Sequence, residues 1–412
     1  MVKRLIVIAA ALAGCKWTDF DDLSDQTWAK STEKPNGDSN DYGIAVQRGA
    51  RSGTGGGTLV VLGNGSSIYS ELSYDASGNA KLAPTEVKLE SAFGVSSFPD
   101  QPLLLADPDS DDVSIAVPSG GNSIAVLTGS HTLSVQQIFG PNAPDAATYV
   151  KFDATMGSRP LIGAGSKVFG VASDASQMHE CTLTDETTQM IAIAALGAAK
   201  RTPADTTETV VVWTKTGKLL LYAPTVWSGT ISGCTGSQTL AAGADTGFTP
   251  GSGAQIFTVK DTSGADTSFV VIAARKAGSG GINDQAARIA VYDISTATPT
   301  LVGSPLDKDG LHGMALASFD NGATTVFAAG YPTAPTGGVT GGVVEIFPIS
   351  TTMGIAGSPT LTLADAQPDE GESFGRAITA MPFNGKTALI VAANNEIFAY
   401  VRLTPLYDDL RP

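Results

Sequence analysis

Short hydrophobic runs separated by small and turn-forming residues recur along the chain after residue 41. Each apolar run ends in residues such as Gly, Asn or Thr-Gly, and a second apolar run follows. This order predicts a β-hairpin, because β-branched and apolar residues favour strands while Gly and Asn favour tight turns. The event occurs seven times, with the paired strands at 59–62 and 67–69, 113–117 and 124–127, 161–162 and 168–171, 210–213 and 219–222, 269–274 and 288–294, 325–329 and 343–347, and 387–393 and 397–401.

The spacing of the hairpins predicts the architecture. Residues near the start of each second strand lie 44 to 71 positions apart, with a mean near 55. A repeat of this length fits one four-stranded blade, and stacking the blades in a closed ring buries both faces of every sheet. A solenoid needs shorter repeats, and a sandwich does not repeat its loop chemistry. We therefore predict an all-β fold, a β-propeller of seven four-stranded blades, with the blade count open by about one.

The first fifteen residues resemble a bacterial lipoprotein signal peptide. Lys3 and Arg4 form a basic head, and residues 5–13 form an apolar run. This run is far shorter than the roughly 20 residues that span a bilayer as a helix. Leu12-Ala13-Gly14-Cys15 then matches a lipobox. The resemblance implies that 1–14 are removed and that Cys15 carries acyl chains such as palmitate, which anchor the chain in a membrane. The alternative is an ordinary secretory signal with a chance cysteine.

Residues 15–41 are polar and acidic, which predicts a lipidated cysteine followed by a solvated tether. Trp17, Phe20 and Trp28 interrupt this pattern, and they either dock on the folded domain or sit near the lipid headgroups. In the lipoprotein family Asp after the cysteine marks retention in the inner membrane, whereas this chain has Lys16. We therefore expect a lipid-anchored protein of the outer membrane, exposed to the periplasm or on the surface.

Residues 42–412 resemble FG-GAP repeats of the integrin-α type. Phe374-Gly375 precedes the seventh hairpin, Leu311-His312-Gly313 precedes the sixth, and the sixth unit continues with Asp320-Asn321-Gly322 and Ala328-Ala329-Gly330-Tyr331. The likeness is good in units six and seven, fair in units one, two and five, and poor in units three and four. It implies a seven-bladed β-propeller, in agreement with the spacing.

FG-GAP loops often carry calcium, which prefers oxygen ligands. The best candidate is the Asp107-Pro108-Asp109-Ser110-Asp111-Asp112 stretch, in which Asp107, Asp109 and Asp111 have the alternate spacing of a calcium loop. Its sixth position is Asp112 rather than the usual glycine, and the closing carboxylate is absent. The alternative is a plain Asx turn. We expect no cofactor other than calcium.

Composition narrows the class of partner. The formal net charge is −15, so the clustered Lys and Arg that nucleic acids require are missing. Cys181 and Cys234 remain after Cys15 is lipidated, and outside the cytoplasm such a pair favours a disulfide, with two free buried thiols as the alternative.

Catalytic motifs are absent from the sequence. The three histidines, His131, His179 and His312, are far apart and belong to no paired motif, and there is no Walker loop or Gly-x-Ser-x-Gly elbow. We therefore expect a non-enzymatic module that binds an envelope protein or a surface glycan, as in adhesion. The FG-GAP resemblance implies ligand-facing loops between second and third strands, here with Arg275, Lys276, Asn283, Asp284 and Tyr331. The alternatives are an assembly scaffold for outer-membrane proteins and a propeller hydrolase or lyase.

Overall fold

The computed structural model describes thirty β-strands and the connections between many of them. It describes residues 28–31, 41–48, 57–64, 68–74, 80–82, 87–88, 103–106, 113–116, 123–127, 133–137, 144–151, 158–171, 178–185, 189–222, 243–251, 253–261, 265–278, 286–319, 324–336, 338–365, 369–383 and 386–400. All regular elements in these ranges are strands, so the expected all-β class is confirmed. No helix in the described part has the length and hydropathy needed to cross a membrane.

The first half of the chain forms four separate sheets. The first contains β2 (Asp41–Arg48), β3 (Gly57–Asn64), β4 (Ile68–Tyr74), β5 (Ala80–Leu82) and β6 (Val87–Lys88). The second contains β7 (Leu103–Ala106), β8 (Val113–Ala116), β9 (Ser123–Leu127) and β10 (Leu133–Gln137). The third contains β11 (Ala146–Lys151), β12 (Ser158–Ala164), β13 (Lys167–Val171) and β14 (Met178–Thr182). The fourth contains β15 (Ile193–Ala199), β16 (Thr209–Thr214), β17 (Lys218–Tyr222) and β18 (Ala244–Asp245).

The second half forms a nine-stranded sheet and a four-stranded sheet. The nine-stranded sheet contains β19 (Gln255–Lys260), β20 (Asp266–Arg275), β21 (Ala286–Asp293), β22 (Thr300–Asp309), β23 (Met314–Phe319), β24 (Thr324–Tyr331), β25 (Val343–Ser350), β26 (Gly354–Ile355) and β27 (Leu361–Leu363). The last sheet contains β28 (Ala377–Phe383), β29 (Lys386–Ala393), β30 (Glu396–Tyr400) and β1 (Trp28–Ser31). All seven hairpins expected from the sequence are present as antiparallel pairs.

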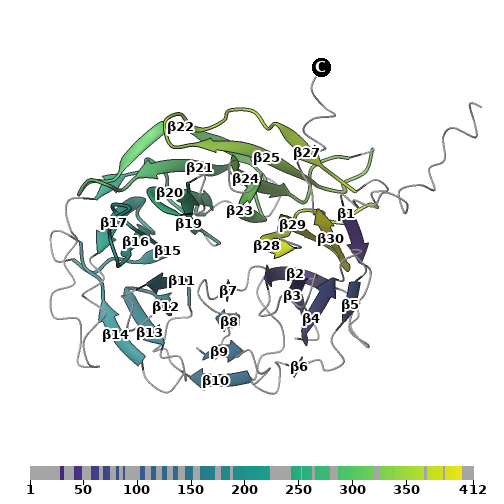
Figure 1. Cartoon of the computed structure of the whole chain (residues 1–412), viewed down its shortest axis with the longest axis horizontal. Helices are drawn as coiled ribbons and strands as arrows, with labels where there is room; N and C mark the ends of the chain where they lie inside the picture. Colours follow the sequence, from purple (N-terminus) through teal and green to yellow (C-terminus); the bar gives the residue numbers. More distant parts are fainter. Residues whose placement is uncertain are drawn as a thin grey trace, which may run out of the picture.

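The sheets are arranged in a ring around a central axis, in the order of the chain (Figure 1). The N-terminal strand β1 joins the last sheet by pairing with β30, from Trp28 opposite Tyr400 to Ser31 opposite Ile397. Residues 28–31 therefore lie in the sheet rather than in the expected tether, and the backbone at Trp28 belongs to the folded ring. Pairing the two ends of the chain in one sheet removes an open edge, which stabilises a ring of this kind.

The core lies between neighbouring sheets, because alternate residues of each strand face opposite sides. Val210 and Val212 of β16 pack in the cluster shared with β11–β14, whereas Val211 and Trp213 pack in the cluster shared with β19–β21. The same alternation places Val271 and Ala273 of β20 against β23–β25. Each fully buried Val, Leu or Phe contributes roughly 1.5–3 kcal/mol of transfer free energy, so this double-sided burial is the main source of stability.

Close glycine contacts join the last sheet to the one before it. Phe374 is fully buried, and its ring packs edge-on against Phe398 at a centroid distance of 5.0 Å. Gly375 follows with a φ of 88°, a conformation that glycine adopts without strain. A Cβ atom on Gly330 would lie 1.9 Å from the carbonyl oxygen of Gly375, and one on Gly313 would lie 2.3 Å from it. The aromatic-Gly and Ala-Ala-Gly signatures noted in the sequence therefore belong to one tightly packed junction.

Candidate functional site

Three connections that are distant in the sequence meet at one end of the last two sheets. The segment 369–376 leads into β28, and Gly371 donates a backbone hydrogen bond of 3.0 Å to the carbonyl oxygen of Thr340 in the β24–β25 connection. Asn394, in the β29–β30 turn, donates from its backbone N–H to the carbonyl oxygen of Glu372 at 2.7 Å. We call this junction of residues 340–341, 369–376 and 394–396 the acidic rim.

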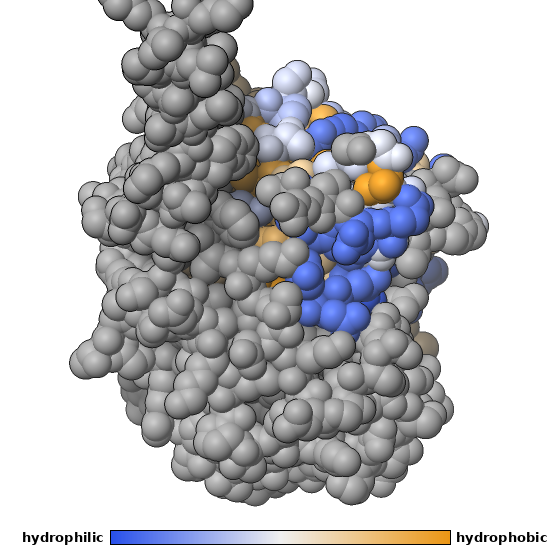
Figure 2. Space-filling model, turned by 90° about the vertical axis from the view of Figure 1, so that its right-hand side faces the viewer, coloured by the Kyte–Doolittle hydropathy of each residue, from blue (hydrophilic) through white to orange (hydrophobic). Residues whose placement is uncertain are grey.

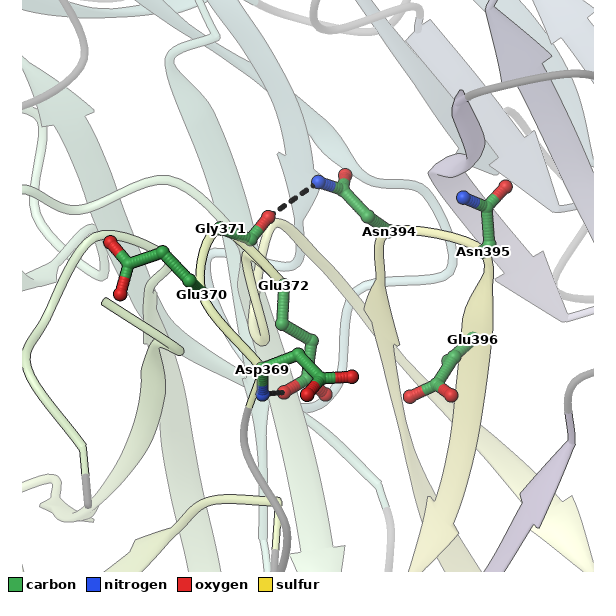
Figure 3. Close-up of a pocket in the computed structure, with 7 residues that line it drawn as sticks. All are labelled: Asp369, Glu370, Gly371, Glu372, Asn394, Asn395 and Glu396. Atoms are coloured by element: carbon green, nitrogen blue, oxygen red, sulfur yellow. Dashed lines mark hydrogen bonds between the residues drawn. The ribbon is translucent and has the colours of Figure 1, made fainter. Parts of the chain in front are cut away.

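Two residues of the acidic rim other than glycine have left-handed backbone conformations. Ser373 has a φ of 60° and Asn395 a φ of 63°. This region is unfavourable for L residues by about 1–2 kcal/mol, although Asn tolerates it better than most. The side chain of Asn394 links the two turns, because it donates a 2.7 Å hydrogen bond to the Gly371 carbonyl (Figure 3). It also accepts a hydrogen bond from the Arg376 guanidinium.

A polar cavity of about 310 Å³ lies in the acidic rim. It is lined by Asp369, Glu370, Gly371, Glu372, Asn394, Asn395 and Glu396. Figure 3 shows Glu396 pointing across the cavity toward the loop that carries Glu372, while Glu370 points away. On the side of the molecule that faces right in Figure 1, the described surface is mainly hydrophilic with small hydrophobic areas (Figure 2). A cavity of this size and polarity suits an ion or a small polar group better than an apolar ligand.

Three carboxylates converge beneath the cavity. Asp365 lies two residues after β27, Glu372 is in the loop before β28, and Glu396 is the first residue of β30. One carboxylate oxygen from each lies within 4.8 Å of the other two. Asp365 and Glu372 are only 7% exposed, whereas Glu396 is half-buried. We call these three residues the acidic triad.

Glu372 carries an incompletely satisfied carboxyl group. Its Oε2 accepts a 3.2 Å hydrogen bond from the backbone N–H of Asp369, whereas its Oε1 is buried and has no hydrogen-bond partner among the described residues. Burial, the side-chain interaction with Asp365 and the charges of Asp365 and Glu396 together raise the pKa of Glu372 to about 7, while the backbone N–H of Asp369 acts to lower it. Burial raises the pKa of Tyr400 as well, with contributions from Asp365 and Glu372. The phenol of Tyr400 therefore lies within electrostatic range of the acidic triad.

The structure describes three of the residues that the sequence analysis expected to face a ligand, and two of these three are buried. Arg275 is the last residue of β20 and is 7% exposed, and Tyr331 is the last residue of β24 and is 6% exposed. The Tyr331 ring lies 4.9 Å from the Lys308 Nζ atom and belongs to the core beside β20 and β21. Lys276 is exposed. Of these three side chains, only that of Lys276 is available at the surface.

Other candidates from the sequence lie outside the described residues. These are Cys15, Asp107, Asp109, Asp111, Cys234, Asn283 and Asp284. Cys181 is buried in the core and is disulfide-bonded. Because Cys234 is not described, its pairing with Cys181 stays a prediction, as do the calcium site at Asp107 and the lipidation of Cys15. His312 is buried, and its Nδ1 lies 2.7 Å from the carbonyl oxygen of Arg376.

The acidic triad was not apparent from the sequence, because its members are 7 and 24 residues apart. No local spacing links Asp365 to Glu372 or Glu372 to Glu396. The available signal was the density of acids in Asp369-Glu370-Gly371-Glu372 immediately before Phe374-Gly375. The backbone hydrogen bonds of the acidic rim, rather than a sequence motif, bring the three carboxylates together.

Comparisons with known proteins bear on the fold. No protein-family model and no curated protein matches the chain. A crystal structure of BBS1N in complex with ARL6DN, soaked with lead, is similar over 92% of this chain and 98% of that chain, with a TM-score of 0.53 and 12% sequence identity. A second structure of this complex, soaked with mercury, matches 76% of this chain and 94% of that chain, with a TM-score of 0.38 and 11% identity. At 12% identity the likeness concerns the overall fold alone.

Proposed function

We propose that this chain is an outer-membrane lipoprotein whose seven-bladed β-propeller binds an envelope protein or a surface glycan through the acidic rim. The proposal has three parts: the propeller, the lipid anchor and the binding surface. They rest on different observations and can fail separately.

The strand order supports a seven-bladed ring. If the nine-stranded sheet is divided at β26, the strands fall into seven antiparallel groups of at least four, each in sequence order apart from β1. The link between β22 and β26 is a single parallel pairing, Ser304 with Gly354. A contact this small is expected where outer strands of adjacent blades touch, and it does not extend into a continuous ladder.

One observation carries the binding role: a polar cavity is lined by two connections, the loop before β28 and the β29–β30 turn, at the end of the sheets where the second-to-third-strand turns lie. A rigid ring holds such connections in fixed positions, and loops on a rigid scaffold are where recognition residues concentrate. The cavity is lined by acids, and the chain has a formal net charge of −15. The partner groups that fit it are therefore basic side chains or sugar hydroxyls, with complementary charge raising the rate of encounter.

The binding role is tested by capture from a solubilised envelope, with the detergent-solubilised full chain as bait. Charge reversal at Glu370, an exposed acid of the acidic rim, should weaken retention of the partner by about tenfold or more. Glu180→Lys is the matched control, because Glu180 is exposed on the outer strand β14, away from the acidic rim. Equal retention by wild type, Glu370→Lys and Glu180→Lys would contradict a role for the acidic rim.

The lipid anchor is tested separately by metabolic labelling with palmitate. Wild type should incorporate label and fractionate with the outer membrane, whereas Cys15→Ser should do neither. An unlabelled wild-type chain would contradict lipidation.

An assembly-scaffold role is the alternative function for the acidic rim, and it predicts that the captured partner is an outer-membrane barrel protein.

A hydrolytic role has one observation in its favour, namely a carboxyl group with a pKa near 7 beside two other carboxylates. Glycoside hydrolysis needs two carboxyl groups on opposite sides of the scissile bond. Glu372 and Asp365 are instead in side-chain contact with each other, which leaves no room for a sugar between them. The acidic triad therefore favours ligand or ion binding over hydrolysis.

A further inference from the structure

We propose that Asp365, Glu372 and Glu396 together bind one calcium ion in the acidic rim. The geometry fits: oxygens from all three carboxylates lie within 4.8 Å of one another. Calcium takes oxygen ligands at about 2.3–2.6 Å, so two oxygens on opposite sides of one ion are separated by up to about 5 Å. The three oxygens can therefore share a single ion without large movement of the backbone.

Glu372 gives an independent indication of a missing partner. The residue is 7% exposed, and its Oε1 is buried with no hydrogen-bond partner among the described residues. Leaving a buried carboxylate oxygen unpaired is costly, because the group has lost its water without replacement. Oε1 belongs to the side chain that lines the cavity from the loop before β28 (Figure 3). A cation at the acidic triad would pair this oxygen.

The charged side chains around Glu372 also favour the binding of a cation. The two side chains whose carboxylate oxygens lie within 4.8 Å of a Glu372 carboxylate oxygen, Asp365 and Glu396, are both acids. Ionised carboxylates offer acceptors only, so the contact between Glu372 and Asp365 becomes favourable when a positive ion or a single proton lies between them. Arg376 is the basic residue of this loop, and its guanidinium donates to Asn394.

The ligand set selects the ion. Three carboxylates form an all-oxygen site, whereas zinc prefers ligand sets with nitrogen or sulfur. Magnesium requires near-ideal octahedral geometry at about 2.0–2.1 Å, while calcium accepts irregular sites with six to eight oxygens. The cavity above the triad leaves room for water molecules to complete the shell. This site is separate from the sequence-predicted calcium loop at Asp107, and it holds whether or not the acidic rim binds a partner.

The test is calorimetric titration of calcium into the chelator-treated, detergent-solubilised full chain. Glu372→Gln and Glu396→Gln should each weaken one binding event by about tenfold or more, because ligand charge sets the affinity of such sites. Glu180→Gln is the matched control, since it removes the same charge from an exposed residue of β14, outside the acidic rim. It should change the affinity by no more than about twofold. Asp109→Asn should leave the same event intact.

A second readout uses the wild-type chain and does not depend on the folding of variants. Terbium should bind the triad and emit when Tyr400 is excited, and calcium should displace it. Calcium at about 100 times its dissociation constant should also raise the thermal midpoint by about 3 °C. The proposal would be overturned if both triad variants bound calcium as tightly as wild type. It would also be overturned if wild type showed neither heat nor terbium emission at about 2 mM ion, above the affinity of weak extracellular calcium modules. The acidic triad would then be a carboxyl pair sharing a proton.

Discussion

The β16–β17 turn and the β29–β30 turn occupy equivalent places, since each joins the second and third strands of its sheet. The first is closed by Gly217, with a φ of 89°, and the second by Asn395, with a φ of 63°. Each turn packs against a loop that contains a buried polar side chain. The β16–β17 turn packs against the loop with Thr246, and the β29–β30 turn packs against the loop with Glu372.

The two buried polar groups differ in how far the protein satisfies them. Thr246 donates through its hydroxyl to the Gly217 carbonyl at 2.6 Å and lies 3.3 Å from the Trp213 Nε1 atom, which donates to it. Every partner of that network is part of the chain. The Glu372 Oε1 atom, in contrast, has no partner in the described part of the structure. A polar group that is buried and satisfied indicates a structural role, whereas a buried carboxylate oxygen without a partner needs an explanation, and a bound ion beside two further carboxylates supplies one.

The largest expected effect comes from breaking the glycine junction that positions the acidic rim. Gly330→Ala places a Cβ atom 1.9 Å from the Gly375 carbonyl oxygen, so the backbone must shift. We expect a loss of about 2–4 kcal/mol in the free energy of unfolding, measured by urea denaturation. Gly357→Ala is the control, because a Cβ there meets nothing within 4 Å. Equal stability of the two variants would show that the junction is not tightly packed.

Removing the Thr246 hydroxyl should destabilise the chain less than Gly330→Ala does. Thr246→Val keeps the shape of the side chain but leaves the buried Trp213 Nε1 without its acceptor. We expect a loss of about 1–3 kcal/mol in the free energy of unfolding, since an unpaired buried donor is penalised. Indole fluorescence during urea unfolding reports it directly. A neutral result would mean that Trp213 finds another acceptor, and the contrast with Glu372 would weaken.

Replacing Glu372 should change the free energy of unfolding in the opposite direction and stabilise the chain. In chelator, Glu372 has a pKa of about 7 in the folded chain, above the ordinary value of 4.5 for a glutamate. Its contribution to stability is therefore fully present below pH 4.5 and is lost as the pH rises through about 7. We expect Glu372→Gln to be more stable than wild type at pH 8 in chelator, by on the order of 1–2 kcal/mol. Thermal unfolding at several pH values measures it, and a Gln variant that is less stable than wild type at pH 8 would contradict the account.

The smallest change in stability is expected for a substitution in the β29–β30 turn. Asn395→Gly relieves a left-handed conformation but increases the freedom of the unfolded chain, and the two effects nearly cancel. We expect a change within about 0.5 kcal/mol in urea denaturation. A larger loss would assign the Asn395 side chain a role in the acidic rim beyond allowing the turn.

Much of the fold follows from the alternation of hydrophobic residues. The hairpin expected at 210–213 and 219–222 corresponds to β16 (Thr209–Thr214) and β17 (Lys218–Tyr222). The burial of Tyr331 follows from the same rule, because Phe327, Ala329 and Tyr331 alternate on one face of β24 and share one core cluster. The FG-GAP resemblance implied that Tyr331 lies in a ligand-facing loop, whereas Tyr331 is the last residue of β24 and is buried.

The remaining features depend on contacts that sequence patterns do not encode. The segment Trp28-Ala29-Lys30-Ser31 is too short and too polar to indicate a strand by itself, and it becomes one by pairing with the exposed edge of β30. The acidic triad depends on backbone hydrogen bonds such as that from Asn394 to Glu372, which hold the β29–β30 turn against the connection between β27 and β28. Any of the forty acidic residues could have been a candidate, and only the folded structure selects these three.

The most direct test of the cation site is anomalous diffraction from crystals of the full chain grown with calcium. The account predicts one ordered ion in the acidic rim, at about 2.3–2.6 Å from carboxylate oxygens of Asp365, Glu372 and Glu396. A well-ordered acidic rim without an anomalous peak, in which Glu372 and Asp365 are joined by a short carboxyl–carboxylate hydrogen bond, would contradict it.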